Sequence, residues 1–301
     1  MKWFVVLVVI MGLATVGVAN ADSSQPEDTQ AQGKGKDMVE HFTFNGQERT
    51  YLLHLPPGLD KEKPVPLLVM LHYYTGTGEA EAYQTGFSDK ADVERFIAVY
   101  PDGPNPAPPG FAWNTPSPEP GPNADAAFVG EVIRRLQAQY AIDQKRIYVC
   151  GMSQGAFAAY AIGCELSSVV AAIAPVNGIL FTKPKSADPI SVLIVNGTDD
   201  QGIPFNGAKA SEQTGGLAIP SVAEAVAVWV AHNGCSKEPK KTRRENIAIE
   251  VYSGGRQGTE VVLYKRVGGG HEWPGDQSDK TKTTYIGAGD IWEFFKQHPK
   301  Q

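Results

Sequence analysis

Cysteine, basic clusters and long apolar segments are all scarce in this sequence. Its three cysteines stand at no Cys/His spacing that resembles a zinc site. A net charge of −6 argues against binding to nucleic acid or to an anionic membrane surface. Internal repeats are absent, and no second linker divides the chain. These absences point to one acidic globular domain.

One apolar run stands apart from the rest, at residues 3–18. It follows Lys2 and precedes the small-x-small sequence at 19–21, which is the layout of a secretory signal peptide. The run is short for a membrane span and no basic cluster follows it, so we favour cleavage over anchoring. We predict a signal peptide at 1–21 and a secreted protein, extracellular or periplasmic, with no membrane anchor in the mature chain.

The mature chain divides into a short leader and one domain. Residues 22–37 are polar without apolar periodicity, which predicts a disordered leader. Residues 38–301 are enough to bury a substantial core as a single domain. In an oxidising compartment, one disulfide among Cys150, Cys164 and Cys235 is expected, with one thiol left over. The sequence leaves the pairing open, together with the alternative of three buried thiols.

The apolar pattern changes from alternation to buried runs along the domain. Alternating residues around an Asn-Gly pair predict a hairpin over 38–55. Continuous apolar runs and helical periodicities follow, and residues 104–122 form a proline- and glycine-rich loop. The strand-like segments are 66–71, 96–100, 146–150, 169–176, 190–195, 247–252 and 260–267; the helical segments are 125–140, 153–166, 222–232 and 291–295. This order predicts an α/β fold, a mainly parallel sheet with helices on both faces, whose ligands bind at the carboxyl ends of strands.

A G-x-S-x-G motif occupies residues 151–155, with Ser153 at its centre. It lies between a strand-like segment and an alanine-rich helix, the setting in which a sharp turn exposes a nucleophilic serine. The N–H of Gln154, at the helix N-terminus, is then a candidate oxyanion donor. The alternative is that Ser153 only caps the helix. The position of the motif favours the nucleophile.

A serine nucleophile needs a base, which is usually histidine. Among six histidines, His271 follows three glycines just past the carboxyl end of a predicted strand, and it comes after the serine in the chain. The acid expected between the two follows strand 190–195, as Asp199 or Asp200. The residues leave both aspartates open, together with the interpretation that they only shape the turn.

A second oxyanion donor is expected in the loop after the first buried strand. That loop continues from His72 with two tyrosines, and the backbone N–H of Tyr73 or Tyr74 is the candidate. We expect the His72 side chain to hold the loop rather than to take part in catalysis.

Over residues 38–295 the chain resembles the family of secreted α/β-hydrolases that contains feruloyl esterases, acetylxylan esterases and polyhydroxybutyrate depolymerase-like proteins. The resemblance is carried by blocks in family order: LLVMLHYYTGTGEA, VYPDG, FAWNT, KRIYVCGMSQGAFAAY, AAIAPVNG, VLIVNGTDDQGIPFNG, VWVAHNGC and GGGHEWPG. It implies the α/β-hydrolase fold, with 38–301 as the catalytic domain. It supports Ser153 and His271, selects Asp200 as the acid, and implies no metal or organic cofactor.

The chain departs from this family at two positions. Tyr73 stands where the family usually has glycine. If the backbone were left-handed there, a tyrosine would be strained and would misplace the donor, and losing one donor costs about 100- to 1000-fold in turnover. Many relatives also carry a cysteine near 252–255 that could pair with the one at Cys235. Gly255 stands in that segment, so Cys235 is expected to be free or to pair elsewhere.

The predicted function is hydrolysis of carboxylic esters through an acyl-enzyme. Ser153 attacks the carbonyl while His271 takes its proton, and water then releases the acyl group. Activity is expected to fall at acid pH as His271 becomes protonated. Export favours esters of plant-wall polysaccharide, especially feruloylated xylan. Trp113 and Trp273 are candidates for an aromatic platform that binds the substrate, with packing as the alternative.

Two other functions are alternatives to an esterase that acts on plant-wall polysaccharide (a wall esterase). The first is a hydroxyalkanoate depolymerase-like esterase, because polymer recognition leaves no decisive local signature. The second is a catalytically impaired carbohydrate-binding protein on the same fold, motivated by Tyr73. An intact catalytic triad argues against this second alternative.

Overall fold

The computed structural model describes residues 33–114, 123–211, 218–275 and 286–301. The predicted signal peptide and most of the predicted leader lie outside the described residues. The first strand begins at Lys36, so the last two residues assigned to the leader belong to this strand.

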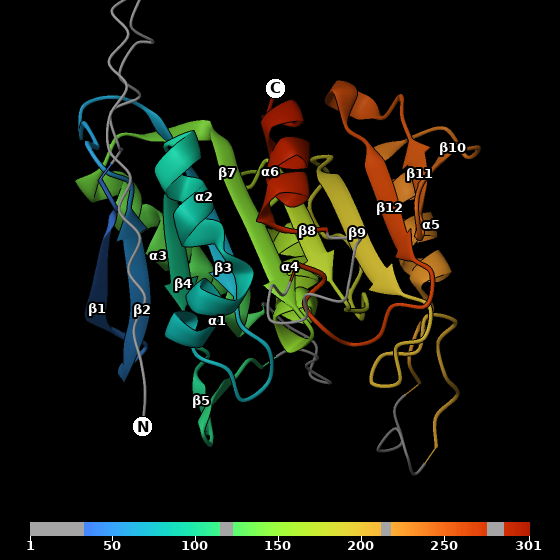
Figure 1. The fold of residues 1–301 in the computed structure, drawn as a ribbon, viewed down its shortest axis with the longest axis horizontal. Coiled ribbons are helices and arrows are strands. Elements are labelled where there is room, and N and C mark those ends of the chain that lie inside the picture. The colour runs from blue at the N-terminus through green and yellow to red at the C-terminus, as the bar shows by residue number, and fades with distance from the viewer. Residues whose placement is uncertain (1–32, 115–122, 212–217, 276–285) are drawn as a thin grey trace, which may run out of the picture. The chain divides into compact units, whose positions relative to one another are not determined.

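Ten strands of the described chain form one sheet, in the order β1-β2-β4-β3-β7-β8-β9-β12-β11-β10 (Figure 1). They are β1 (Lys36–Phe44), β2 (Gln47–Leu55), β3 (Val65–Leu71), β4 (Ile97–Pro101), β7 (Ile142–Met152), β8 (Ala172–Val176), β9 (Ser191–Gly197), β10 (Lys240–Arg244), β11 (Ile247–Tyr252) and β12 (Val261–Arg266). The six strands from β4 to β12 across the middle are parallel, and antiparallel pairs flank them on both sides. The predicted mainly parallel sheet is confirmed.

Helices cover both faces of this sheet (Figure 1). They are α1 (Gly78–Thr85), α2 (Phe87–Glu94), α3 (Ala124–Gln139), α4 (Gln154–Glu165), α5 (Val222–Asn233) and α6 (Ala288–Gln297), with a short 3₁₀ turn at Arg256–Gly258. One core lies between the sheet and α3, α4 and α5. A second core lies on the other face, beneath α1, α2 and α6. Successive residues of β3 alternate between the two cores, Leu67 and Val69 in one and Leu68 in the other, because a parallel strand is buried on both faces.

The predicted hairpin pairs Phe44 with Gln47 across the Asn45-Gly46 turn. Both turn residues have positive φ, 49° and 78°, which is the backbone that Asn-Gly favours. Residues 104–114, in the first part of the predicted loop, contain a second small hairpin made of β5 (Asn105–Ala107) and β6 (Gly110–Ala112). Residues 115–122 of that loop lie outside the described chain.

Helices α1 and α2 and strand β10 also have no counterpart in the prediction. Helices α1 and α2 have only eight residues each. The buried positions of α1 are small or polar, and α2 buries only Phe87 and Ala91, so neither shows a sustained apolar pattern. Strand β10 reads KKTRR and is exposed throughout. It lies at the edge of the sheet, where lysine and arginine discourage pairing with other chains. Pairing with β11, rather than apolar pattern, makes it a strand.

All three cysteines are buried free thiols. The expected disulfide is therefore not formed, and the alternative of three buried thiols describes the structure. None of the described helices has the length and apolar character needed to cross a membrane.

Candidate active site

Ser153 lies in a sharp turn between the end of β7 and the start of α4. Its backbone has φ 55° and ψ −117°, a conformation that L-residues rarely adopt and that strains the turn. Close approach of the backbone makes the turn possible. A Cβ at Gly151 would lie 2.3 Å from the Gly155 oxygen, and one at Gly155 would lie 2.1 Å from the Leu71 oxygen. These two glycines thus bring α4 against β7 and β3.

The Ser153 side chain makes no capping hydrogen bond to α4, so the interpretation of Ser153 as a mere helix cap is wrong. Instead, its Oγ lies 2.8 Å from Nε2 of His271, and Nδ1 of His271 lies 2.7 Å from Oδ2 of Asp200. In a neutral imidazole, Nδ1–H donates to Asp200 and Nε2 accepts the Ser153 hydroxyl proton. The structure thus joins the three predicted residues, distant in sequence, into one hydrogen-bonded chain.

The two neighbouring aspartates have different surroundings. The Asp200 carboxylate is fully buried, and its second oxygen accepts the N–H groups of Gly202 and Ile203 at 2.8 and 2.7 Å. Asp199 is exposed and accepts the Thr198 hydroxyl at 2.8 Å. Of the two aspartates, only Asp200 bonds His271, which favours Asp200 as the candidate acid.

The two tyrosine N–H groups proposed as oxyanion donors have different surroundings. The Thr75 N–H donates to Phe111 and the Gly76 N–H to the Tyr73 oxygen, both at 2.9 Å. The Tyr73 N–H lies near the buried carboxyl of Glu81 without completing a hydrogen bond to it. Burial raises the pKa of this carboxyl to about 8, and the nearby N–H lowers it in part. The Tyr74 N–H has no partner among the described residues. Of the two N–H groups, only that of Tyr73 lies near a buried carboxyl, so Tyr74 is the better candidate for an oxyanion donor.

The first donor, Gln154, is the first residue of α4, and its N–H also has no partner in the described part of the chain. The Gln154 side chain makes hydrogen bonds of its own, to the backbone of Trp113. Gln154 Oε1 accepts the Trp113 N–H at 3.0 Å, and Nε2 donates to the Trp113 oxygen at 3.2 Å. This pair of bonds ties the segment after β6 to the start of α4.

The strain anticipated at Tyr73 does not occur. Residues 72–74 are outside the left-handed region, and the positive φ of this loop belongs to Thr75, at 67°. Position 73 therefore does not require glycine in this chain. The motive for regarding the oxyanion loop as impaired is removed.

His72 holds the loop, as expected. Its Nδ1 lies 2.7 Å from the Tyr73 oxygen and its Nε2 accepts the Gly103 N–H at 2.9 Å. Burial lowers the pKa of His72, which favours the neutral ring that this bonding requires. His72 makes these bonds to Tyr73 and Gly103 and none to Ser153 or His271, so it belongs to the framework of the site.

The two predicted substrate-binding tryptophans are buried, with 3% of Trp113 and 1% of Trp273 exposed. Trp113 donates its indole N–H to the His72 oxygen at 2.9 Å, and Trp273 packs edge-on against Phe87. Neither forms the exposed platform that the sequence suggested, because both rings are used in packing. The aromatic side chain exposed on the oxyanion loop is Tyr74, at 57%, which the sequence interpretation considered only for its backbone.

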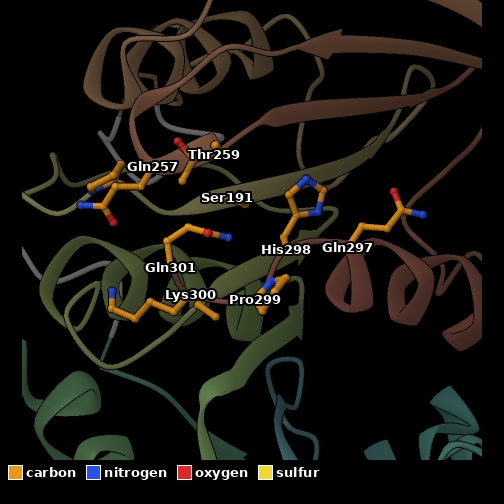
Figure 2. Close-up of a pocket in the computed structure, with 11 residues that line it drawn as sticks. Ser191, Gln257, Thr259, Gln297, His298, Pro299, Lys300 and Gln301 are labelled. Atoms are coloured by element: carbon orange, nitrogen blue, oxygen red, sulfur yellow. The ribbon is translucent and has the colours of Figure 1, made fainter.

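A pocket shown in Figure 2 lies away from this constellation. It is lined by the starts of β8, β9 and β12 and by the C-terminal residues after α6, including Ser191, Thr259 and His298. Ser153, Asp200 and His271 follow the opposite, carboxyl ends of parallel strands. The described residues hold no group of three or more His, Cys, Asp or Glu placed to bind a metal.

The chain matches the family described as esterase PHB depolymerase over residues 49–227. The chain belongs to this family. Feruloyl esterase B of Piromyces equi is 30% identical over 236 residues, which cover 74% of this chain and 42% of that protein. Poly(3-hydroxyalkanoate) depolymerase C of Paucimonas lemoignei is 30% identical over 144 residues, covering 47% of this chain and 34% of that one. The chain thus spans less than half the length of either of these relatives.

Acetyl xylan esterase from Aspergillus awamori has a similar structure. The TM-score is 0.62 at 14% identity, covering 86% of this chain and 99% of that one. At this identity the likeness bears on the fold, and it establishes the predicted α/β-hydrolase fold.

Proposed function

We propose that this member of the esterase PHB depolymerase family is a serine hydrolase of carboxylic esters. The observation that carries the proposal is the unbroken chain of hydrogen bonds from Ser153 through His271 to Asp200. In this proposal Ser153 is the nucleophile and His271 the base. Asp200 fixes the tautomer of His271 and stabilises its imidazolium.

Two backbone N–H groups, of Gln154 and Tyr74, are proposed to stabilise the oxyanion. Both are without partners among the described residues, one at the N-terminus of α4 and one in the loop after β3. The tetrahedral intermediate collapses to an acyl-Ser153 with loss of the alcohol, which takes its proton from His271. Water activated by His271 then releases the acid.

The proposed substrates are feruloyl-type esters of plant-wall polysaccharide, acted on outside the cytoplasm after removal of the signal peptide. The names of the relatives support the ester class. The exposed ring of Tyr74, adjoining the proposed donor, supports an aromatic acyl group. The depolymerase in the same family supports the second candidate, a hydroxyalkanoate esterase.

The test compares p-nitrophenyl acetate, p-nitrophenyl butyrate and methyl ferulate as substrates. Wild type is assayed beside Ser153→Ala, Asp200→Asn and the matched control Asp199→Asn. We expect losses of about 10⁴-fold or more for the first variant and about 10³- to 10⁴-fold for the second. The control should stay within about twofold, because the Asp199 side chain is exposed and bonds Thr198 rather than His271.

The substrate profile decides between the two esterase candidates. A strong preference for methyl ferulate supports the wall esterase, and a preference for butyrate supports the hydroxyalkanoate esterase. A folded wild type inactive on all three esters would contradict the proposal.

The impaired-protein alternative has its own test in Tyr73→Gly. Because Tyr73 has no positive φ to relieve, we expect no rise in kcat. A rise of about 100-fold, the effect of a regained oxyanion donor, would restore the impairment hypothesis.

A further inference from the structure

Asn177 follows β8 and is fully buried between the loops that carry the candidate catalytic residues. It was not among the residues singled out from the sequence, although it lies in the AAIAPVNG block. Its backbone is left-handed, with φ 48°, a conformation that asparagine tolerates better than most residues. A buried polar residue with a strained backbone is kept only where the surrounding structure holds it in place, so the contacts of Asn177 need to be explained.

Both ends of the Asn177 side chain are bonded, and to different loops. Nδ2 donates to the Glu272 oxygen at 2.8 Å, directly after His271. Oδ1 accepts the Gly197 N–H at 3.3 Å, at the end of β9 and three residues before Asp200. One amide group therefore bridges the segment of the acid and the segment of the base.

The backbone around Asn177 extends the same connection to the nucleophile. The Asn177 N–H donates to Val195 at 2.7 Å, and the preceding carbonyl, of Val176, accepts the Ser153 N–H at 2.9 Å. Because of the left-handed turn, the backbone of residues 176–177 bonds both β9 and the serine turn. The Asn177 side chain at the same time reaches the loop that carries His271.

Arg266 is a second residue that bonds the loop carrying His271. Arg266, at the end of β12, is 7% exposed. Its guanidinium donates to the Gly270 and Glu272 oxygens at 3.4 and 3.3 Å and pairs with the Glu272 carboxylate. Arg266 thus ties this loop to its own strand. The Asn177 side chain differs from that of Arg266 because it also bonds β9, the strand that leads to Asp200.

We propose that Asn177 is a positioning residue that sets the spacing between Asp200 and His271 together with the direct bond from the Asp199 N–H to the Gly269 oxygen at 2.9 Å, and through it the alignment of His271 on Ser153. The inference rests on the proposed esterase function for its kinetic test. It predicts that losing the bridge leaves substrate binding intact but lowers the rate of chemistry, since misplacing a base by about 1 Å can cost about 100-fold.

Two variants separate the two bonds. Asn177→Gly removes both and keeps the positive φ, which glycine adopts freely. Asn177→Asp keeps the acceptor for Gly197 but replaces the donor to Glu272 with a carboxylate oxygen. We expect Asn177→Gly to lower kcat on p-nitrophenyl acetate about 10- to 100-fold with KM within about twofold. Asn177→Asp should lower kcat at least as much.

Asn233 supplies the matched control. It is also fully buried, and its amide bonds the N–H and oxygen of Ile190 at 3.1 and 2.7 Å, just before the start of β9 and away from the site. Asn233→Ala should lower the unfolding midpoint while leaving kcat of the folded enzyme within about twofold. If kcat falls equally in both asparagine variants, or if Asn177→Gly and Asn177→Asp stay within about twofold of wild type, the positioning role is overturned.

A second readout does not depend on turnover. A hydrogen bond between imidazole Nδ1–H and a carboxylate gives a low-field proton resonance, assigned here by its loss in His271→Ala. We expect this resonance to shift or broaden in Asn177→Gly and to be unchanged in Asn233→Ala. An unchanged resonance in Asn177→Gly contradicts positioning. If wild type hydrolyses none of the esters yet the resonance responds as expected, the proposed function fails while the positioning role stands.

Discussion

At the scale of single residues, the most unusual side chain outside the triad is Glu81 of α1. Its carboxyl is fully buried, and neither oxygen completes a hydrogen bond of normal geometry among the described residues. Burial raises its pKa from the ordinary 4.5 to about 8, opposed only partly by the Tyr73 N–H. Burial raises the pKa of both Cys150 and Tyr100, and the nearby Glu81 carboxyl adds to this rise. A buried acid of this kind is held by the fold at a cost in stability.

Replacing Glu81 with glutamine should stabilise the protein in a pH-dependent way. The unfolded chain releases the Glu81 proton near 4.5 and the folded chain only near 8, so wild-type stability is lost progressively as pH rises through this interval. We expect Glu81→Gln to gain little near pH 4 and several kcal/mol by pH 9. Denaturant unfolding at pH 4, 7 and 9 measures this difference.

The control for this prediction is Glu79→Gln, on the same helix but exposed. Its effect should be small and should not grow with pH. A gain for Glu81→Gln of the same size at all three pH values would show that Glu81 does not titrate in the way its burial implies.

At the scale of secondary-structure elements, the serine turn depends on how closely α4 docks. A Cβ at Gly155 would lie 2.1 Å from the Leu71 oxygen and 2.6 Å from the His72 oxygen. These are backbone atoms of β3 and the oxyanion loop, so they cannot move without displacing both elements. The docking of α4 therefore couples fold stability to the geometry of both proposed oxyanion donors.

Two glycine-to-alanine substitutions test this coupling. Gly155→Ala should destabilise the protein by about 1–3 kcal/mol or more, as overpacking does, and should lower kcat because it separates the Tyr74 and Gln154 N–H groups. Gly130→Ala, within α3, places its methyl group 3.5 Å from Leu166 and should stabilise by up to about 1 kcal/mol. Thermal unfolding and ester hydrolysis measure both. Equal effects of the two substitutions would disprove the close-docking explanation.

At the scale of the whole molecule, the thiols are enclosed by the two cores and the end of α5. Burial raises the pKa of Cys150 well above its usual range, that of Cys164 to about 12, and that of Cys235 to a smaller extent. Low thiolate content and low access both suppress reaction with disulfides. The fold thus accounts for three unpaired thiols without any cross-link.

We therefore expect the native protein to be almost unreactive toward a chromogenic aromatic disulfide at pH 8. In guanidinium chloride the same reagent should titrate three thiols, with or without prior reduction. Intact mass under oxidising conditions provides the control, and a mass two units below that of the reduced chain would reveal a disulfide that this structure does not contain.

Much of the architecture follows from local pattern. Continuous apolar runs specify buried parallel strands, Asn45-Gly46 specifies the hairpin turn, and G-x-S-x-G between a strand and a helix specifies the serine turn. These features are encoded by neighbouring residues, so they could be predicted from the sequence. The family resemblance added the choice of Asp200 and the identity of the α/β-hydrolase fold.

Other features depend on contacts between distant segments. Helices α1 and α2 lack an apolar stripe, and β10 is a strand only because it pairs with β11. The burial of Trp113 and Trp273, the negative φ of Tyr73 and the absence of a disulfide are likewise outcomes of packing. No local pattern could reveal them.

The sequence by itself determined which residue types are available for ester chemistry and in what order they occur along the chain. The tertiary structure decided which of them meet, because hydrogen bonds such as His271 to Asp200, 71 positions apart, and Asn177 to Glu272, 95 positions apart, form only once parallel strands place their carboxyl ends together. Local propensity acts over a few residues, whereas the alignment of a nucleophile, a base and an acid is a property of the packed sheet.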